Sequence, residues 1–317
     1  MKRDIRIGRY MNISVVIPLY NERESLHELA SNLSVNLKNL GLSYEIIFID
    51  DGSDDGSLPL LKQLHEEHKN IKIISFRRNY GKSAALSEGF LIAQGEIIIT
   101  MDADLQDDPA EIPNLIDKIN SGYDMVSGWK KKRQDPLKKT IPSKVFNKTT
   151  ALLTGIEIHD FNCGLKAYRQ EVIKEIPVYG ELHRYLPVLA HWRGYRVGEI
   201  VVQHYPRKFG LTKYGWRRFF HGFFDLLTVL FLTRYRQRPL HLFGFFGLLS
   251  FTMGFVISLY LTILWLQGVG IGNRPLLFLG ILLIIVGMQS FSIGLIGEMI
   301  TSVRDEKNIP SIKEKIL

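Results

Sequence analysis

Two hydrophobic periods alternate along the larger, N-terminal part of the chain. Short β-branched runs, such as those at 13–17 and 97–101, are typical of strands that are covered on both faces. Between these runs apolar residues recur at helical spacing, as they do over 22–39. We expect strands at 13–17, 44–49, 71–76, 96–101, 124–128, 161–169 and 197–204, and helices at 22–39, 55–68, 81–93, 109–121 and 181–192. This alternation predicts an α/β fold of βαβ units with a mostly parallel sheet.

The C-terminal part of the chain follows a different pattern. Residues 239–273 contain no Asp, Glu, Lys or Arg, and residues 275–297 contain none either. Because crossing the ~30 Å hydrocarbon core of a bilayer takes about 20 apolar residues, we predict a hairpin of two transmembrane helices, at about 240–266 and 276–300. The alternative is a buried hydrophobic hairpin, but a soluble domain rarely needs two uncharged helices of this length.

Basic residues flank the two apolar stretches at their outer ends: Arg234, Arg236, Arg238, Arg304 and Lys307. The short connection between the stretches carries only Arg274. Since positively charged loops stay in the cytoplasm, both chain ends and the whole α/β domain are expected on the cytoplasmic face of the inner or plasma membrane. The basic N-terminus lacks a long apolar core, so we expect no signal peptide.

Charge and cysteine content narrow the possible partners. The net charge of +8 indicates an anionic partner, which could be nucleic acid, a phosphorylated substrate or a lipid surface. The single cysteine, Cys163, excludes an internal disulfide and a cysteine-based zinc site. Residues 130–148 carry eight Lys or Arg and one Asp, and apolar residues 151–153 follow. This segment is either a solvated basic face or an amphipathic surface on anionic lipid, and the hydrophobic C-terminus favours lipid.

Candidate chemistry lies where the predicted strand at 96–101 ends. Asp102 and Asp104 follow this strand, and residues two apart in an extended backbone point to the same side. Helix initiation explains Asp108 and Glu111, with Asp108 as the N-cap, but it gives no structural role to Asp102 or Asp104. Two carboxylates at the carboxyl end of a buried strand suit Mg²⁺ or Mn²⁺ carrying a substrate phosphate.

Four segments near predicted strand ends carry a family resemblance. IPLYNE, DDGSDDGS, NYGKSAALSEG and MDADLQDDP, in this order and spacing, resemble the GT-A domain of family 2 inverting glycosyltransferases. DFNCGLKAYRQ, the basic stretch 207–214 and the apolar hairpin narrow this resemblance to the polyprenyl-phosphate glycosyltransferases. The resemblance covers essentially the whole chain from Asn12 onward. We therefore expect a tail at 1–11, a GT-A catalytic domain at 12–213 with a membrane-facing segment at 129–155, an interfacial helix at 214–238, two transmembrane helices within 239–303, and a cytoplasmic tail at 304–317.

The resemblance also implies roles for individual residues. The nucleotide sugar would contact Pro18, Tyr20, Glu22, Asp51, Lys82, Asp102 and Ala103, with Asp51 accepting a hydrogen bond from the base. The divalent cation, Mg²⁺ or Mn²⁺, would be held by Asp102, Asp104 and Gln106. In addition to Asp104, the resemblance implies a second catalytic carboxylate, Asp160, which would lie on the acceptor side. Arg207 and Lys213 would approach a phosphate, and Thr212 stands where the family usually has Ser before that lysine.

The implied activity is metal-dependent, inverting transfer of a hexose from a nucleotide diphosphate sugar to polyprenyl phosphate. UDP-glucose is our first choice of donor, because the chain most resembles the bacterial glucosyl branch that uses undecaprenyl phosphate. GDP-mannose and UDP-linked amino sugars remain open. A phosphate acceptor is already anionic near neutral pH, so we hypothesise that Asp160 positions a substrate more than it removes a proton. Glycines in the hairpin permit a homo-oligomer without showing one.

Four other readings are weaker. A processive polysaccharide synthase usually has a Gln-x-x-Arg-Trp signature and more membrane helices, and the sequence has neither. Gly81-Lys82-Ser83 resembles part of a P-loop, but Phe76 stands where the first glycine is needed. Nucleic-acid binding rests on charge alone, so we expect no nucleic-acid partner. A catalytically inactive membrane scaffold is disfavoured because Asp102, Asp104 and Asp160 are all present.

Overall fold

The computed structural model describes residues 11–131, 137–176, 178–180, 182–206, 208–209, 239–272 and 274–304, together with residues 228 and 231. The chain forms two compact units, Met1–Val229 and Leu230–Leu317, and each is described by itself. The predicted N-terminal tail up to residue 10, most of the predicted interfacial helix at 214–238, and the tail beyond residue 304 lie outside the described residues.

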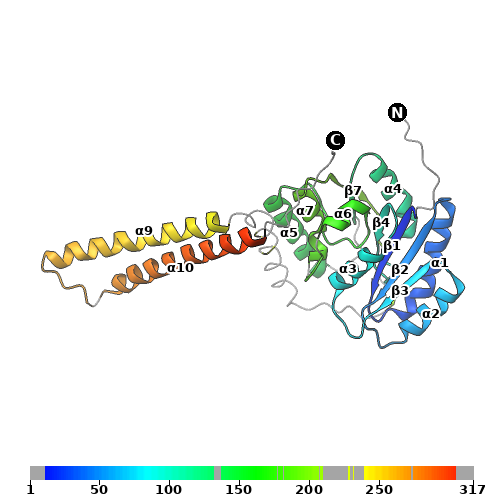
Figure 1. The fold of residues 1–317 in the computed structure, drawn as a ribbon, viewed down its shortest axis with the longest axis horizontal. Coiled ribbons are helices and arrows are strands. Elements are labelled where there is room, and N and C mark those ends of the chain that lie inside the picture. Colours follow the sequence, from blue (N-terminus) through cyan, green and yellow to red (C-terminus); the bar gives the residue numbers. More distant parts are fainter. Residues whose placement is uncertain are drawn as a thin grey trace. The chain divides into compact units, whose positions relative to one another are not determined.

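The first unit is built on a seven-stranded sheet with the order β3-β2-β1-β4-β6-β5-β7 (Figure 1). Its strands are β1 (Ile13–Leu19), β2 (Tyr44–Asp50), β3 (Ile71–Ser75), β4 (Ile97–Thr100), β5 (Met125–Trp129), β6 (Lys166–Arg169) and β7 (Val197–Val201). Neighbouring strands run parallel except at β6, which is antiparallel to both β4 and β5. The prediction of a mostly parallel α/β sheet is confirmed.

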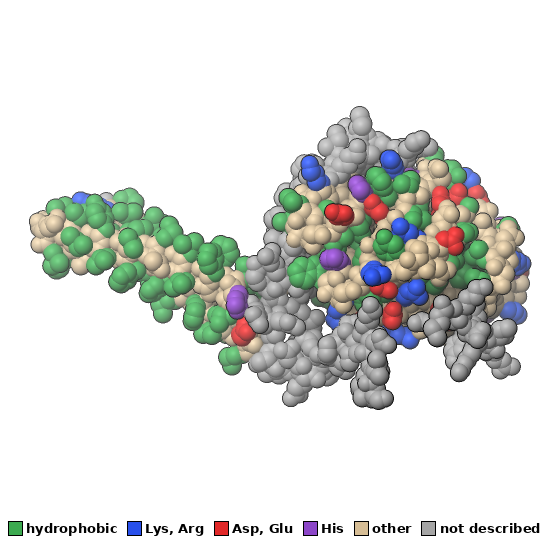
Figure 2. Space-filling model, turned by 90° about the horizontal axis from the view of Figure 1, so that it is seen from above, with side chains coloured by type: hydrophobic (Ala, Val, Ile, Leu, Met, Phe, Trp, Pro, Cys, Tyr) green, Lys and Arg blue, Asp and Glu red, His purple; other side chains and the backbone are tan. Residues whose placement is uncertain are grey.

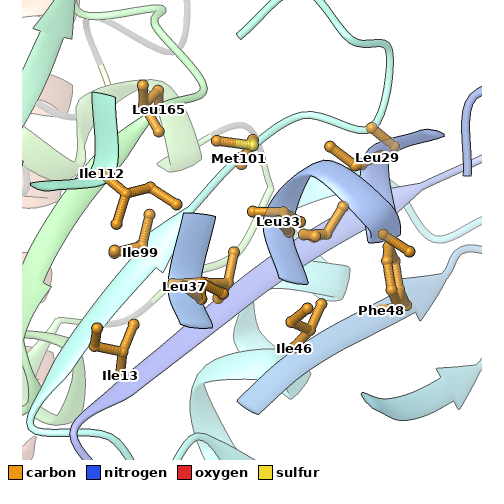
Figure 3. Close-up of a cluster of buried hydrophobic side chains, with 14 of the residues drawn as sticks. Ile13, Leu29, Leu33, Leu37, Ile46, Phe48, Ile99, Met101, Ile112 and Leu165 are labelled. Atoms are coloured by element: carbon orange, nitrogen blue, oxygen red, sulfur yellow. The ribbon is translucent and has the colours of Figure 1, made fainter. Parts of the chain in front are cut away.

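Helices cover both faces of this sheet. Helices α1 (Arg23–Asn39), α2 (Ser57–Glu67) and α4 (Ile112–Asn120) pack on one face, and α3 (Lys82–Ile92), α6 (Gln170–Glu175) and α7 (Leu186–Trp192) pack on the other. Figure 3 shows Leu29, Leu33 and Leu37 of α1 in the first core, close to Ile46 and Phe48 of β2. Because these leucines recur every four residues, they form one apolar stripe along α1. Burying each of them contributes about 1.5–3 kcal/mol.

Two predicted helices are each divided in two. The expected helix at 109–121 consists of the 3-10 turn η1 (Pro109–Glu111) followed by α4, and that at 181–192 consists of η2 (Leu182–Tyr185) followed by α7. A proline, Pro113 or Pro187, stands in the first turn of each α-helix, where it has no N–H to bond back to the preceding turn. The predicted N-cap is confirmed, because the Asp108 side chain accepts a hydrogen bond from the Ala110 N–H at 2.9 Å.

The predicted strand at 161–169 is wrong over its first half. Only residues 166–169 pair in the sheet, as β6, and residues 161–165 form an irregular turn. Phe161, Cys163 and Leu165 are buried in this turn, so the apolar character that suggested a strand serves the core instead. The structure also has the short helix α6, which the sequence pattern did not predict, and β7 ends three residues before the predicted boundary at 204.

The basic segment at 129–155 contains α5 (Leu137–Thr154). Near the C-terminal end of α5, Leu152 and Leu153 are exposed to solvent. Exposed leucines beside a basic stretch are typical of a surface that lies on lipid. The structure contains no membrane, so this role stays a prediction.

The second unit contains an antiparallel pair of long helices, α9 (Pro239–Leu266) and α10 (Pro275–Arg304). Both are long and apolar enough to cross a membrane, and only 11% of the most apolar window in each is buried. Figure 2 shows hydrophobic side chains distributed along this hairpin, whereas charged side chains gather on the other unit. The predicted hairpin of two apolar helices is confirmed, with each boundary within four residues of its predicted place.

Glycines bring the two helices of the hairpin together. A Cβ atom on Gly254 would lie 2.6 Å from the Gly280 carbonyl oxygen, and one on Gly287 would lie 2.7 Å from that of Gly247. Close backbone approach at small residues is the usual means of helix packing in membranes. Gly247 and Gly287, two of the glycines that were expected to permit self-association, therefore serve contacts within one chain. Where α9 begins and α10 ends, Glu298 of α10 accepts a hydrogen bond from the Leu240 N–H of α9 at 3.3 Å.

Candidate active site

The candidate site is built by loops that leave the carboxyl ends of β1, β2 and β4. Leu19, the last residue of β1, pairs with Asp50, the last residue of β2, and Val16 of β1 pairs with Thr100, the last residue of β4. The segments at 18–22, 50–53 and 102–106 therefore leave the sheet at the same edge, as the sequence predicted. This edge of a parallel sheet is where ligands bind in open α/β folds.

Asp102 follows β4 directly and is surrounded by lysines. Its carboxylate forms an ion pair with the Lys82 ammonium, and about a third of each side chain remains exposed. Burial would raise the pKa of Asp102, but the positive charges of Lys82, Lys130 and Lys166 outweigh it and lower the pKa to about 2. Gly164 approaches so closely that a Cβ there would lie 2.4 Å from Asp102 Oδ2. Asp102 is thus ionised and held in a narrow space.

Asp104 has a different electrostatic environment. Burial and the negative charges of Asp102 and Asp107 raise the pKa of Asp104 to about 6. Its Oδ1 accepts a hydrogen bond from the Gln106 backbone N–H at 3.2 Å. Leu105, between them, has a φ of +59°, which costs a non-glycine residue about 1–3 kcal/mol. Strain of this kind is typical of loops whose shape serves a function.

A buried ion pair supports this acidic loop from behind. Lys130 Nζ lies 2.7 Å from Asp107 Oδ1, and the Asp107 side chain is fully buried. Burial would lower the pKa of Lys130, but Asp107 outweighs it and raises that pKa above its ordinary range. The backbone of Asp107 also forms a bridge with His204. The sequence analysis did not select Lys130, and it assigned Asp107 no role beyond the acidic loop.

The donor set at the end of β4 fits a divalent cation. Within the described ranges, no cluster of three or more His, Cys, Asp or Glu side chains forms a complete metal site. Mg²⁺ at nucleotide sites is commonly held by one or two carboxylates together with substrate phosphates, so Asp102 and Asp104 suffice. The negative charges of Asp102 and Asp107 repel that of Asp104 and help to raise its pKa, and a bound cation would offset this repulsion. The Gln106 amide donates to the Tyr205 carbonyl at 3.2 Å, which fixes Gln106 beside this pair.

The predicted nucleotide residues lie along the same edge. Asp51 is buried, and its two carboxylate oxygens accept hydrogen bonds from the backbone N–H groups of Tyr80 and Gly81, at 2.7 and 2.9 Å. Burial raises the pKa of Asp51, although these two hydrogen bonds oppose the shift. Gly52 lies against the same loop, since a Cβ there would be 2.5 Å from the Arg78 carbonyl carbon. In this structure Asp51 therefore anchors the loop that leads to Lys82.

The loop between β1 and α1 is fastened to the loop after β2. Asn21 donates from its side chain to Asp54 Oδ1 at 2.8 Å and accepts from the Asp54 N–H at 3.0 Å. With a φ of +56°, Asn21 adopts the left-handed conformation that Asn tolerates better than most residues. The half-buried Tyr20 and Glu22 stand on either side of it. Ala103, by contrast, packs its side chain into the core, so only its backbone faces any ligand.

Asp160 lies in the irregular turn that precedes β6. It is buried, and its Oδ1 accepts a hydrogen bond from the Asn162 N–H at 3.1 Å. Its carbonyl oxygen accepts one from the Ser127 hydroxyl at 3.3 Å. The turn therefore fixes the Asp160 backbone against β5. The negative charges of Asp160 and Asp102 both favour the charged form of Lys166 and so raise its pKa, against the effect of burial.

A small cavity opens beside Asp102, on the side of α3 and α7. Its polar lining includes Lys82, Asp102, Lys166, His183 and Arg184. These basic side chains come from three separate elements: the start of α3, the start of β6, and η2. Burial and the charges of Lys82, Arg184 and Lys166 lower the pKa of His183 well below its ordinary value, so it is neutral. Its Nδ1 lies 2.9 Å from the Ser83 hydroxyl.

The structure thus brings together, at one edge of the sheet, the predicted residues Pro18, Tyr20, Glu22, Asp51, Lys82, Asp102, Asp104, Gln106 and Asp160. Arg207 and Lys213 lie outside the described residues. The sequence analysis selected none of Lys130, Lys166 and His183 as site residues. For Lys166 a signal was present, since a lysine stands within the predicted strand at 161–169, which is mostly apolar apart from Asn162 and Arg169.

The comparisons with known proteins agree with this geometry. Residues 14–177 match the family described as "Glycosyl transferase family 2". The chain is 36% identical over 304 residues to the dodecaprenyl-phosphate galacturonate synthase of Rhizobium johnstonii, covering 93% of this chain and 90% of the relative. It is also 36% identical over 297 residues to the undecaprenyl-phosphate 4-deoxy-4-formamido-L-arabinose transferase of Klebsiella pneumoniae, covering 93% of this chain and 89% of the relative.

Among solved structures, the chain is similar to a glucosyl-3-phosphoglycerate synthase from Mycobacterium tuberculosis, in complex with Mn²⁺, UDP and glucosyl-3-phosphoglycerate. The TM-score is 0.51 with 17% sequence identity, and the match covers 70% of this chain and 79% of that chain. At this identity the likeness shows the fold alone, and it confirms the GT-A fold that the sequence predicted.

Proposed function

This chain belongs to glycosyl transferase family 2 and is a glycosyltransferase, and from this premise we propose that it transfers one sugar from a nucleotide diphosphate sugar to polyprenyl phosphate. An oxygen of the acceptor phosphate forms the new bond to the anomeric carbon. The bond from that carbon to the donor phosphate breaks, and its electron pair leaves with the nucleoside diphosphate. Attack opposite the leaving group inverts the anomeric centre.

The observation that carries the proposal is the arrangement at the end of β4. Asp102 and Asp104 stand together there, and Lys82 and Lys130 supply positive charge to the same place. A donor diphosphate is an anion that gains charge as it leaves, and preorganised charge at the site of that change is usually a large term in catalysis. This arrangement suits a phosphate leaving group better than it suits a scaffold surface.

We propose that Asp102 and Asp104 hold Mg²⁺ or Mn²⁺, with Gln106 beside them. The structural neighbour from Mycobacterium tuberculosis binds Mn²⁺ together with UDP, which supports a divalent ion in this fold. When bound, such an ion offsets the charge that develops on the leaving diphosphate. Asp102 is already ionised for this role, because its pKa is lowered to about 2. On the other side of the loop, Lys130 keeps Asp107 paired and the backbone in place.

Asp160 is proposed to orient a substrate rather than to act as a general base. A phosphate monoester is largely dianionic near neutral pH, since its second pKa is about 6, so its oxygen needs no proton removed. Asp160→Asn should then retain most of its turnover at every pH. Loss of several orders of magnitude in turnover that recovers at high pH would identify Asp160 as a true base.

The donor sugar is the least constrained part of the proposal. UDP-glucose is the first choice from the family resemblance, and GDP-mannose remains an alternative. The two relatives are named for the transfer of galacturonate and of 4-deoxy-4-formamido-L-arabinose. Nucleotide-linked forms of a uronic acid and of an amino sugar should therefore be tested as donors together with UDP-glucose and GDP-mannose.

The hairpin supports a lipid acceptor. Both relatives are named for polyprenyl phosphates, and α9 and α10 are long enough to cross a bilayer. An enzyme anchored at the membrane meets its lipid substrate at a high effective concentration. We propose that the catalytic domain lies on the cytoplasmic face, because the basic residues near 234–238 and 304–307 flank the hairpin at its outer ends.

The test uses the full chain in detergent with undecaprenyl phosphate, a panel of radiolabelled donors, and either Mn²⁺ or a chelator. We expect a labelled glycolipid with one of UDP-glucose, UDP-galacturonate, a UDP-linked amino sugar or GDP-mannose, and only in the presence of metal. Asp104→Ala should abolish it, and Asp117→Ala on the exposed side of α4 is the matched control. Absence of product with every donor would refute the proposal and favour a scaffold.

A further inference from the structure

Lys166 is a buried charge to which the proposed mechanism has so far given no task. It is the first residue of β6, pairs with Thr100 at the end of β4, and is only 4% exposed. Its ammonium donates a hydrogen bond to the Cys163 carbonyl. In the described part of the chain it forms no ion pair with a carboxylate. An ammonium has three donors, so two remain for another partner.

Burying the Lys166 ammonium without a paired carboxylate costs free energy unless an anion binds next to it. Taking an ammonium out of water carries a large desolvation penalty, and proteins normally offset it with a directly paired charge. Burial indeed lowers the pKa of Lys166, and the carboxylates of Asp160 and Asp102 oppose that shift only in part. Lys166 lines the cavity beside Asp102, so an anion bound in this cavity would lie next to Lys166.

We propose that Lys166 and His183, which line the same cavity, bind the phosphate of the lipid acceptor. This inference rests on the proposed function. Lys166 interacts electrostatically with both Asp102, on the donor side, and Asp160, on the predicted acceptor side. The donor diphosphate already has its counter-charge in the cation that Asp102 and Asp104 suit. The acceptor phosphate is the remaining anion of the reaction, and the residues expected to hold it, Arg207 and Lys213, lie outside the described residues.

His183 completes the site as a neutral hydrogen-bonding group. Its Nδ1 lies 2.9 Å from Ser83 Oγ, and its backbone N–H donates to the same oxygen at 3.3 Å, so the ring is fixed at the cavity wall. A neutral imidazole adds no charge to the cluster of Lys82, Lys166 and Arg184. It therefore contacts a phosphate oxygen without adding to the mutual repulsion of these three positively charged side chains.

The test measures acceptor and donor binding separately on the full chain in detergent. Farnesyl phosphate is titrated into protein saturated with UDP and Mn²⁺, and farnesol serves as the uncharged probe. A hydrogen bond to a charged group implies that Lys166→Met weakens farnesyl phosphate binding by at least about tenfold. Affinity for farnesol and for UDP should stay the same. Lys166→Arg should recover part of the loss, and Lys174→Met, at an exposed lysine of α6, should bind like the wild type.

Thermal unfolding separates this role from a structural one. Replacing an unpaired buried charge with an apolar side chain is neutral or stabilising, so Lys166→Met should unfold at the wild-type temperature or above it while it loses acceptor affinity. A fall in both unfolding temperature and UDP affinity would show that Lys166 only holds the turn at Cys163, and would overturn the proposal.

The remaining outcomes are also decisive. Wild-type affinity of Lys166→Met for farnesyl phosphate would overturn the proposal while leaving the proposed function intact. Selective loss of UDP-galacturonate binding relative to UDP would assign the ammonium to a carboxylate of the donor sugar instead, again against the proposal. If the wild-type protein itself neither binds nor glycosylates a polyprenyl phosphate, the proposed function fails, and the inference fails with it.

Discussion

Replacing Gly164 with alanine should displace the Asp102 carboxylate and leave the fold in place. A Cβ atom on Gly164 would lie 2.4 Å from Asp102 Oδ2, 2.5 Å from Cγ and 2.8 Å from Oδ1. Ordinary van der Waals contact begins at 3.4 Å, so the carboxylate must move by about 1 Å (3.4 − 2.4). The φ of Gly164 lies outside the left-handed region, so alanine adds no backbone strain there.

The expected effect on activity is large and the expected effect on stability is small. A misplacement of about 1 Å in an active site can cost about 100-fold in rate, which corresponds to about 2.7 kcal/mol of activation free energy. Forcing a side chain off its rotamer costs about 0.5–1.5 kcal/mol, and the lower chain entropy of alanine in the unfolded state offsets about 0.4–1 kcal/mol of this. The free energy of unfolding should therefore change by less than about 1 kcal/mol.

The assay compares sugar transfer, UDP binding in the presence of Mn²⁺, and thermal unfolding. Gly272→Ala is the matched control, because nothing lies within 4 Å of a Cβ at that position. Asp102→Ala removes all three atoms that meet the new Cβ. In that background Gly164→Ala should have no further effect on UDP binding or on unfolding, which a double-mutant cycle detects. Wild-type transfer by Gly164→Ala would refute the reasoning. So would a loss of transfer if Gly164→Ala changed UDP binding or unfolding equally in the wild-type and Asp102→Ala backgrounds.

Three further predictions follow from buried groups. Burial raises the pKa of Cys163 to about 12, so about one thiol in ten thousand is ionised at pH 8. Iodoacetamide should therefore label the protein only after unfolding, and rapid labelling of the native protein would contradict this. Lys130→Met should lower the free energy of unfolding by about 3–5 kcal/mol, because it leaves Asp107 buried without its partner, and a further Asp107→Leu change should recover most of the loss in a denaturant titration. Gly287→Val should destabilise the hairpin in a detergent unfolding assay, since a Cβ there meets the Phe251 N–H nitrogen at 2.6 Å, whereas Gly244→Val, with its nearest neighbour at 3.5 Å, should not.

Local patterns in the sequence were sufficient for most of the fold. The β-branched runs and the leucine stripe of α1 depend only on residue spacing, and the structure confirms the elements they predicted. The strand prediction was wrong at 161–165 because Phe161, Cys163 and Leu165 are apolar residues that pack in the core without pairing in the sheet. The antiparallel direction of β6 depends on a tertiary connection, which periodicity does not report.

The candidate site divides in the same way. Asp102 and Asp104 were found because their strand and their spacing place them together. Lys166 and His183 are 17 residues apart in sequence, and they line one cavity with Asp102 only after β6 pairs with β4 and η2 packs against α3. Similarly, Lys130 was assigned to a basic surface segment, yet it is buried against Asp107. Its neighbours in sequence carry no sign of that contact.

The most direct test of the account is the mass of the lipid product. Purified full-length protein is incubated with undecaprenyl phosphate, Mn²⁺ and the donor that the panel selects, and the lipid extract is analysed by mass spectrometry. We expect undecaprenyl phosphate plus a single sugar residue, with an equal amount of nucleoside diphosphate released and no product from Asp104→Ala. Free sugar without a glycolipid, or a lipid carrying a diphosphate or several sugars, would contradict transfer of one sugar to a lipid phosphate.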